Sequence, residues 1–139
     1  MADETPVGDI EYLPAGYTRI GATDAFKTAV INFIGAQGGL ISLHSDDPGT
    51  TGANEIPSTN GYTRQTTTWG TTPAMDSVTK RAVITGSLVT FSVPTGSVTY
   101  YAVRKADGTF LYGKALQPGV TLNSPGTISI TPTHAYGLL

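Results

Sequence analysis

The sequence predicts a mainly β protein, an antiparallel β-sandwich or a partly closed barrel, with one N-terminal amphipathic helix and an extended N-terminal arm. Three observations lead to this prediction. After residue 39, apolar and polar residues alternate in several short segments, as they do in half-buried strands. Turn residues separate these segments at short intervals, which is typical of antiparallel sandwiches and barrels. One earlier stretch repeats its apolar residues with the period of a helix.

The composition limits the classes of function. The chain has 139 residues, no cysteine and a net charge of −2 with eight Lys and Arg. The lack of cysteine excludes disulfides, thiolate metal sites and cysteine nucleophiles, and so few basic residues form no stripe for nucleic acid. The start of the chain is acidic and unlike a signal peptide, and the longest apolar run is too short to span a bilayer. We therefore expect synthesis in a cytoplasm and no membrane partner.

The chain divides into an extended N-terminal arm, residues 1–22, and a single β-sandwich domain, residues 23–139. Two prolines and three glycines interrupt the arm, which has no sustained periodicity. Such a segment is expected to be disordered alone and to become ordered when it lies on a neighbouring subunit. The residues expected to anchor it there are Tyr12, Leu13, Tyr17 and Ile20.

The segment "TDAFKTAVINFIGAQGG" predicts a helix over residues 24–35. Thr23 or Asp24 can cap its N-terminus, and glycines at 35, 38 and 39 are expected to end it. Five apolar residues share one helical face and are expected to pack in the core, rather than against a membrane or a partner. They are Phe26, Ala29, Val30, Phe33 and Ile34.

The remaining segments predict six or seven short strands. Asp107 and Gly108 supply the turn of the clearest hairpin, which covers residues 97–116. In the last strand, Ile128 and Ile130 are expected to face the same way. The other expected strands lie at 39–44, 62–69, 78–86, 87–93 and 126–132.

The stretch "LHSDDPGTTGANEIP", residues 43–57, raises the question of a metal site. Read as a calcium loop from Asp47, it lacks the glutamate required at its last position. A looser cation site using Asp46, Asp47 and Glu55 stays open, whereas His44 and the distant His134 are too few nitrogen ligands for zinc. Dense turn chemistry favours a defined structural loop between strands 39–44 and 62–69 instead.

No catalytic, cofactor-binding or metal-binding residue can be assigned from the sequence. The segment "GTFLYGK", residues 108–114, fits a phosphate-binding loop except at its last position, but it lies in a hairpin rather than before a helix. No serine nucleophile elbow is present. Aromatic residues, among them Trp69, could line a sugar-binding face, although in a sandwich they more often serve the core and the interfaces.

The order of elements, with the strand ending "ISLHSDDPGTTGANEIP" and the segment "GYTRQTTTW", resembles a family of small tailed-bacteriophage virion proteins. The family includes tail-fibre-like proteins, minor tail proteins and head-decoration proteins. The resemblance covers residues 24 to about 70 well and the later strands only by their pattern. It implies a structural role for the loop residues that match the motif, with Asn54 and Glu55 tying the loop to the sheet. The matching residues are His44, Asp47, Pro48, Gly49, Gly52, Asn54, Glu55, Tyr62 and Arg64.

The resemblance further implies a non-enzymatic accessory subunit on the surface of the virion, made in the host cytoplasm. Its partners would be capsid, tail or fibre subunits, with no nucleic acid or membrane. From the predicted architecture we expect a homo-oligomer, with a trimer as the favoured state. The alternative is a module of the tail that binds host-surface glycans through Trp69, Tyr100 and Tyr101.

Overall fold

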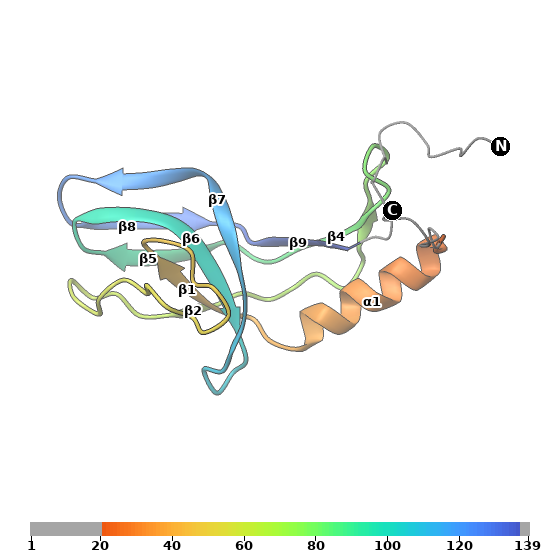
Figure 1. The fold of residues 1–139 in the computed structure, drawn as a ribbon, viewed down its shortest axis with the longest axis horizontal. Coiled ribbons are helices and arrows are strands. Elements are labelled where there is room, and N and C mark those ends of the chain that lie inside the picture. Colours follow the sequence, from red (N-terminus) through yellow and green to blue (C-terminus); the bar gives the residue numbers. More distant parts are fainter. Residues whose placement is uncertain (1–20, 137–139) are drawn as a thin grey trace, which may run out of the picture.

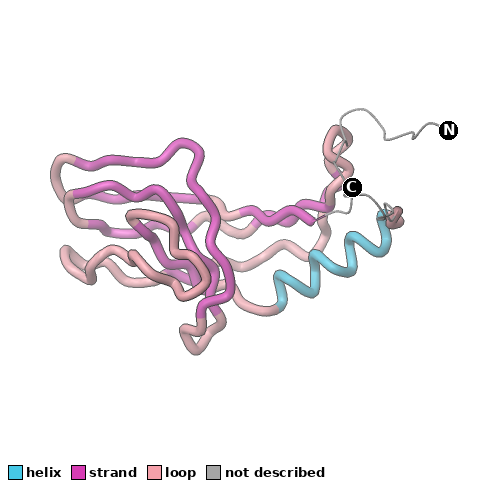
Figure 2. The backbone as a smooth tube through the Cα atoms, in the orientation of Figure 1, coloured by secondary structure: helices cyan, strands magenta, loops and turns pink. Residues whose placement is uncertain are grey.

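The computed structural model describes residues 21–136. The arm residues Tyr12, Leu13, Tyr17 and Ile20, expected to contact a partner, therefore lie outside the described residues. The described part contains one helix and nine strands (Figures 1 and 2). These are α1 (Asp24–Ala36), β1 (Leu40–His44), β2 (Gln65–Thr66), β3 (Ala74–Met75), β4 (Ala82–Thr85), β5 (Val89–Val93), β6 (Gly96–Arg104), β7 (Phe110–Leu122), β8 (Gly126–Ile130) and β9 (Thr133–Tyr136).

The strands form three open antiparallel sheets, and this confirms the prediction of a mainly β fold with one helix. The largest sheet has the order β2-β1-β6-β7, the second has the order β3-β4-β9, and β5 pairs with β8. Strands β6 and β7 form the predicted hairpin, and Gly108 takes a φ of 96° in its turn. Figure 1 shows α1 and the β4/β9 pair at one end of the molecule and the larger sheet at the other.

The main core lies between the four-stranded sheet and the β5/β8 pair. Ile41 and Leu43 of β1 and Phe91 of β5 are 0% exposed there. The alternation along β5 is regular, with residues 89, 91 and 93 buried and residues 90 and 92 exposed. Ile128 is buried in the same core and Ile130 packs against it, so the two isoleucines of β8 share a face as expected.

Residues 42 and 44 of β1 point away from this core, because side chains alternate between the two faces of a strand. Both are nevertheless 0% exposed. The second face of the four-stranded sheet must therefore be covered as well, and there three of the buried side chains are polar: Ser42, His44 and Arg104.

Helix α1 has the predicted position and the Thr23 cap, whose hydroxyl accepts a hydrogen bond from Phe26 N at 3.1 Å. The prediction that its apolar stripe packs in the core is wrong for most of the stripe. Phe26 is 50% exposed and Phe33 is 66% exposed. The helix instead packs on β4 and β9 through Ile31 and Ile34, and it buries Lys27. Periodicity groups residues on a helical face, but which face turns inward depends on the neighbouring sheet.

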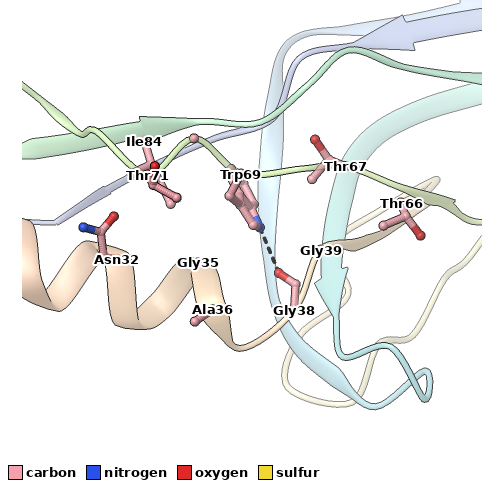
Figure 3. Close-up of a pocket in the computed structure, with 11 residues that line it drawn as sticks. Asn32, Gly35, Ala36, Gly38, Gly39, Thr66, Thr67, Trp69, Thr71 and Ile84 are labelled. Carbon is pink, nitrogen blue, oxygen red and sulfur yellow. Dashed lines mark hydrogen bonds between the residues drawn. The ribbon is translucent and has the colours of Figure 1, made fainter.

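The glycines at the end of α1 serve close packing. The helix continues through Gly35, where a Cβ atom would stand 2.8 Å from Ile84 Cδ1, and it ends at Ala36. At Gly38 a Cβ atom would collide with the carbonyl oxygen of Arg104. On the other side of this segment, the Trp69 indole Nε1 donates a hydrogen bond to Gly38 O at 2.8 Å (Figure 3).

Two strand predictions differ from the structure. The expected strand at 62–69 is reduced to the two residues of β2, followed by an isolated bridge between Trp69 and Gly86. Strands β3 and β9 were not predicted. Each is too short to show a sequence pattern, and each forms by hydrogen bonding to β4. Within residues 21–136, no helix has the length and hydropathy needed to cross a membrane.

Candidate functional site

The loop between β1 and β2 folds through its own turn residues. The Asp47 carboxylate accepts a hydrogen bond from Gly49 N at 2.9 Å, and the Asp47 carbonyl accepts one from the Asn54 amide at 2.9 Å. Gly49, Gly52 and Asn54 have φ values of 61°, 80° and 66°, which glycine and asparagine adopt most readily. These contacts give the loop a defined path between β1 and β2.

Pro48 fixes this loop against the four-stranded sheet. Its ring is fully buried and lies so close to Gly113 of β7 that any side chain at position 113 would collide with it. The Pro48 carbonyl accepts hydrogen bonds from Gly52 N at 3.0 Å and Ala53 N at 3.1 Å. At Gly52 a Cβ atom would stand 3.1 Å from Phe110 Cδ1. Both glycines thus allow the loop to lie directly on the sheet.

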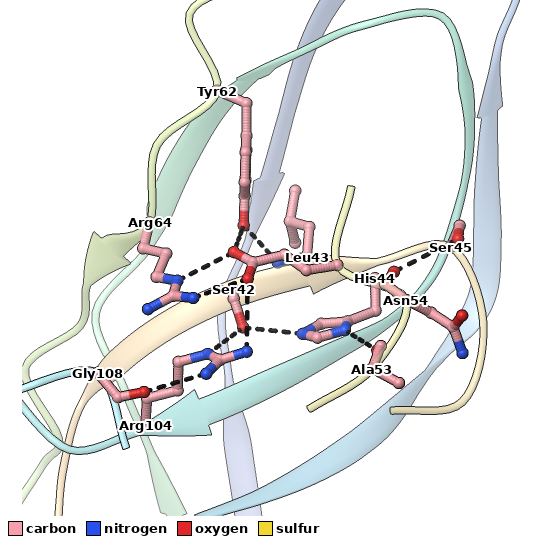
Figure 4. Close-up of polar contacts among 11 residues, drawn as sticks. Ser42, Leu43, His44, Ser45, Ala53, Asn54, Tyr62, Arg64, Arg104 and Gly108 are labelled. Atoms are coloured by element: carbon pink, nitrogen blue, oxygen red, sulfur yellow. Dashed lines mark hydrogen bonds and ion pairs between the residues drawn. The ribbon is translucent and has the colours of Figure 1, made fainter. Parts of the chain in front are cut away.

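Under the loop lies a polar network centred on His44 (Figure 4). Its Nδ1 atom lies 2.7 Å from Ala53 O, and its Nε2 atom lies 2.9 Å from Ser42 Oγ. Because a carbonyl only accepts, Nδ1 carries the proton and Nε2 accepts from the Ser42 hydroxyl. Ser42 Oγ in turn accepts from Arg104 Nε at 2.9 Å. The chain of donors therefore runs in one direction, from Arg104 through Ser42 and His44 to the loop.

Glu55 accepts hydrogen bonds from three further side chains of this network. Its carboxylate accepts from Tyr62 Oη at 2.9 Å and from Arg64 Nε at 3.0 Å and Nη2 at 2.8 Å. Arg104 Nη2 lies 3.4 Å from the same carboxylate, and Tyr62 Oη accepts from Leu43 N at 2.9 Å. One carboxylate thus joins the loop, the segment before β2 and strand β6.

The environment of these groups shifts their pKa values. Burial lowers the pKa of His44, so the imidazole is neutral near pH 7. Burial alone would raise the pKa of the Glu55 carboxyl, but hydrogen bonds from Arg64 and Tyr62 and the nearby positive charges hold that pKa below its usual value. Burial also raises the pKa of Tyr62, which keeps its hydroxyl as a donor. The network is therefore a carboxylate held between two guanidinium groups beside a neutral histidine.

The chemistry open to this network is limited by burial. Ser42 and His44 reproduce the contact between a serine nucleophile and its base, but both side chains are 0% exposed and Nδ1 faces a carbonyl rather than a carboxylate. A substrate has no route to them. Glu55 faces arginines rather than Asp46 and Asp47, and in the described part of the chain no three His, Asp or Glu side chains group as metal ligands.

The structure places all nine residues of the sequence motif in the loop between β1 and β2 or directly beside it. Sequence reasoning missed Ser42 and Arg104, which complete the network from β1 and β6. One signal was present: Arg104 is a charged residue at the end of the apolar segment "YYAVR". A charge at a buried strand position requires a partner inside the protein.

A second feature is a groove of about 490 Å³ between the C-terminal half of α1 and residues 66–71. Asn32, Trp69 and Thr71 lie around it (Figure 3). Trp69 is half-buried. Tyr101, which the sequence placed with Trp69 on a glycan-binding face, is only 4% exposed and donates to Thr133 O. This tyrosine belongs to the core, so the alternative of a glycan-binding face cannot use it.

The fold and the network define a class of protein, a small β domain with one helix in which a buried ion-pair network contacts a surface loop. Residues 15–135 match the family Gp80, podophage GP4 fiber I protein gp80, and the chain belongs to this family. It is therefore a phage fibre-type protein, which agrees with the coarser part of the sequence resemblance. No curated protein and no solved structure gives a significant match.

Proposed function

We propose that this protein is a non-enzymatic structural subunit of the tail fibre of a podophage virion. The observation that carries the proposal is the family match over residues 15–135, which extends from before α1 into β9. The buried network supports it, because its Ser, His and Glu groups are occupied in tying the loop to the sheet. In this proposal the nine motif residues have a structural role.

The subunit associates with other virion proteins and with copies of itself, with a trimer as the expected state. The N-terminal arm, residues 1–22, makes the attachment through Tyr12, Leu13, Tyr17 and Ile20. The low fraction of charged residues, 13% against roughly 25% in ordinary soluble domains, supports a chain with extensive protein contacts. Fibre membership favours a tail location over the head-decoration role that the sequence also allowed.

Deletion of the gene from the phage tests this proposal. The expected particles have complete heads and packaged DNA but lack an appendage in electron micrographs, and a copy of the gene supplied in the host restores it. A matched complementing variant lacking residues 1–20 is expected to fold but not to restore the appendage. Normal appendages in the deletion phage would contradict the proposal.

The second candidate is binding of a host-surface glycan, and the groove beside Trp69 favours it. An indole ring offers an apolar face to a sugar ring, and the Asn32 amide and Thr71 hydroxyl at the same groove offer hydrogen bonds. A glycan array tests this candidate. Asn32→Ala and Thr71→Ala are expected to abolish any signal without changing the core. A full chain that binds no glycan on the array would remove the candidate.

A further inference from the structure

The chain between Glu55 and β2 contains a tight turn whose central residues are Asn60 and Gly61. Tyr62 N donates a hydrogen bond to Thr59 O at 3.1 Å, which closes the turn. Asn60 and Gly61 have φ values of 55° and 82°. The pair Asn-Gly favours two successive positive φ values, because asparagine tolerates the left-handed region and glycine has no Cβ atom. The backbone conformation thus accounts for the choice of these two residues.

The same pair also brings together two groups that react with each other. The side-chain carbonyl carbon of an asparagine and the backbone nitrogen of the following residue can join in a five-membered ring. A glycine in the second position leaves that nitrogen open to approach, because it carries no side chain. Asn60 and Gly61 are both exposed, and within the described residues Gly61 N donates no backbone hydrogen bond. Burial therefore does not protect the asparagine, and no backbone acceptor in this part of the chain holds the nitrogen.

The turn has to open for the ring to form, because the glycine nitrogen must rotate toward the asparagine side chain. Opening breaks the hydrogen bond between Thr59 O and Tyr62 N, and three of the four turn residues are exposed to water that can replace it. A groove of about 560 Å³, lined by Ser58 and Thr63 among others, borders the turn. The structure therefore leaves space for local opening and for the water that completes the reaction.

We propose that the turn at Asn60 and Gly61 is a site of spontaneous deamidation, which converts Asn60 to aspartate and isoaspartate. The Gly61 nitrogen forms a bond to Asn60 Cγ and loses its proton, the bond between Cγ and Nδ2 breaks, and the side-chain nitrogen leaves as ammonia. Water then adds to either carbonyl of the cyclic imide and opens the ring to aspartate or isoaspartate. Each event adds one negative charge to a chain whose net charge is −2.

The other three asparagines of the chain lack this combination of features. Asn54 donates through its side chain to Asp47 O at 2.9 Å, and Asn32 lies in the hydrogen-bonded backbone of α1. Asn123 is exposed in the turn between β7 and β8, but the next residue is a serine, whose side chain crowds the backbone nitrogen. Asn60 is therefore expected to be the first asparagine of the folded chain to react.

Isoaspartate at position 60 would act on the network beneath the loop. It adds a carbon atom to the main chain between Thr59 and Tyr62, so the hydrogen bond that closes the turn no longer fits. Tyr62 follows the turn directly and is 4% exposed, and its hydroxyl joins Leu43 N to the Glu55 carboxylate (Figure 4). The isoaspartate form is therefore expected to unfold at a lower urea concentration than the natural chain.

Incubation of the full chain at mildly alkaline pH, followed by tandem mass spectrometry of its peptides, tests the proposal. Asn60 is expected to gain the mass difference between an amide and a carboxylic acid before any other asparagine does. Isoelectric focusing should show a more acidic band, and an enzyme that methylates isoaspartate should label it. Asn60→Gly is the matched control, because glycine keeps the positive φ and has no amide to lose. It is expected to form no acidic band over the same interval.

The outcomes of this experiment are independent of the fibre subunit role. Reaction at Asn123 as fast as at Asn60 would overturn the assigned site. An Asn60 that stays intact in the folded chain but reacts in urea would show that the turn protects it, and this would overturn the proposal. Urea unfolding of the separated isoaspartate form measures the effect on the network, and a midpoint equal to that of the natural chain would contradict that effect.

Discussion

Glu55→Gln tests whether the network beneath the loop stabilises the fold. The substitution keeps the size of the side chain but removes the charge that faces Arg64 and Arg104. The Arg104 side chain is only 8% exposed, so its charge would lose its carboxylate inside the protein. Removing one partner of a buried ion pair lowers the free energy of unfolding by roughly 3–5 kcal/mol. The side chains of Glu55 and Arg64 are 21% and 35% exposed, and water screens part of the loss.

We therefore expect the free energy of unfolding to fall by about 2–3 kcal/mol, which lowers the melting temperature of a domain this size by about 10 °C. Urea titration followed by the fluorescence of Trp69, the single tryptophan, measures this change. Asp46→Asn is the matched control, because this carboxylate lies exposed on the same loop, and it is expected to change stability by less than about 0.5 kcal/mol. A Glu55→Gln variant as stable as the natural protein would refute the reasoning.

Three further predictions concern pH, the loop and the core. The free energy of unfolding is expected to decline as the pH falls below 6.5, the ordinary pKa of histidine. Burial lowers the folded-state pKa of both His44 and His134, so the unfolded chain takes up these protons first. His44→Gln should reduce this decline, but not abolish it, in urea titrations at successive pH values. Gly52→Ala is expected to lower the free energy of unfolding by about 1–2 kcal/mol, because the residue has a φ of 80° and a Cβ atom would stand 3.1 Å from Phe110 Cδ1. Gly21→Ala is the control: a Cβ atom there meets nothing within 4 Å, so the same titration should show no change. Phe91→Ala removes a ring that is 0% exposed and should cost about 3–5 kcal/mol by thermal unfolding, and a loss below about 1 kcal/mol would contradict the assigned core.

The features that the sequence predicted well are those decided by neighbouring residues. In the loop from 45 to 55, Asp47, Gly49 and Asn54 shape the turns within a few positions of one another. Strand β5 is regular because its alternation is local, and the β6/β7 hairpin follows from the turn at Gly108. In each case the signal and the structure lie within the same short segment.

The features that were missed depend on contacts between distant segments. Ser42 and Arg104 are 62 positions apart, and only the register of β1 on β6 brings them together. The inward face of α1 was predicted wrongly because the stripe that contains Phe33 is more apolar than the face that contains Lys27. Ile31 packs on the β3-β4-β9 sheet, and the Lys80 carbonyl accepts a hydrogen bond from the buried Lys27 ammonium group. No pattern within the helix carries that information.

The most direct test of the fibre subunit assignment is the number of copies of this chain in purified particles, measured by quantitative mass spectrometry against the major capsid protein. The assignment predicts a handful to a few dozen copies per particle, in a fixed ratio to the other tail proteins. Hundreds of copies in simple proportion to the shell would indicate a head-decoration protein instead. Absence from particles would contradict a structural role in the virion altogether.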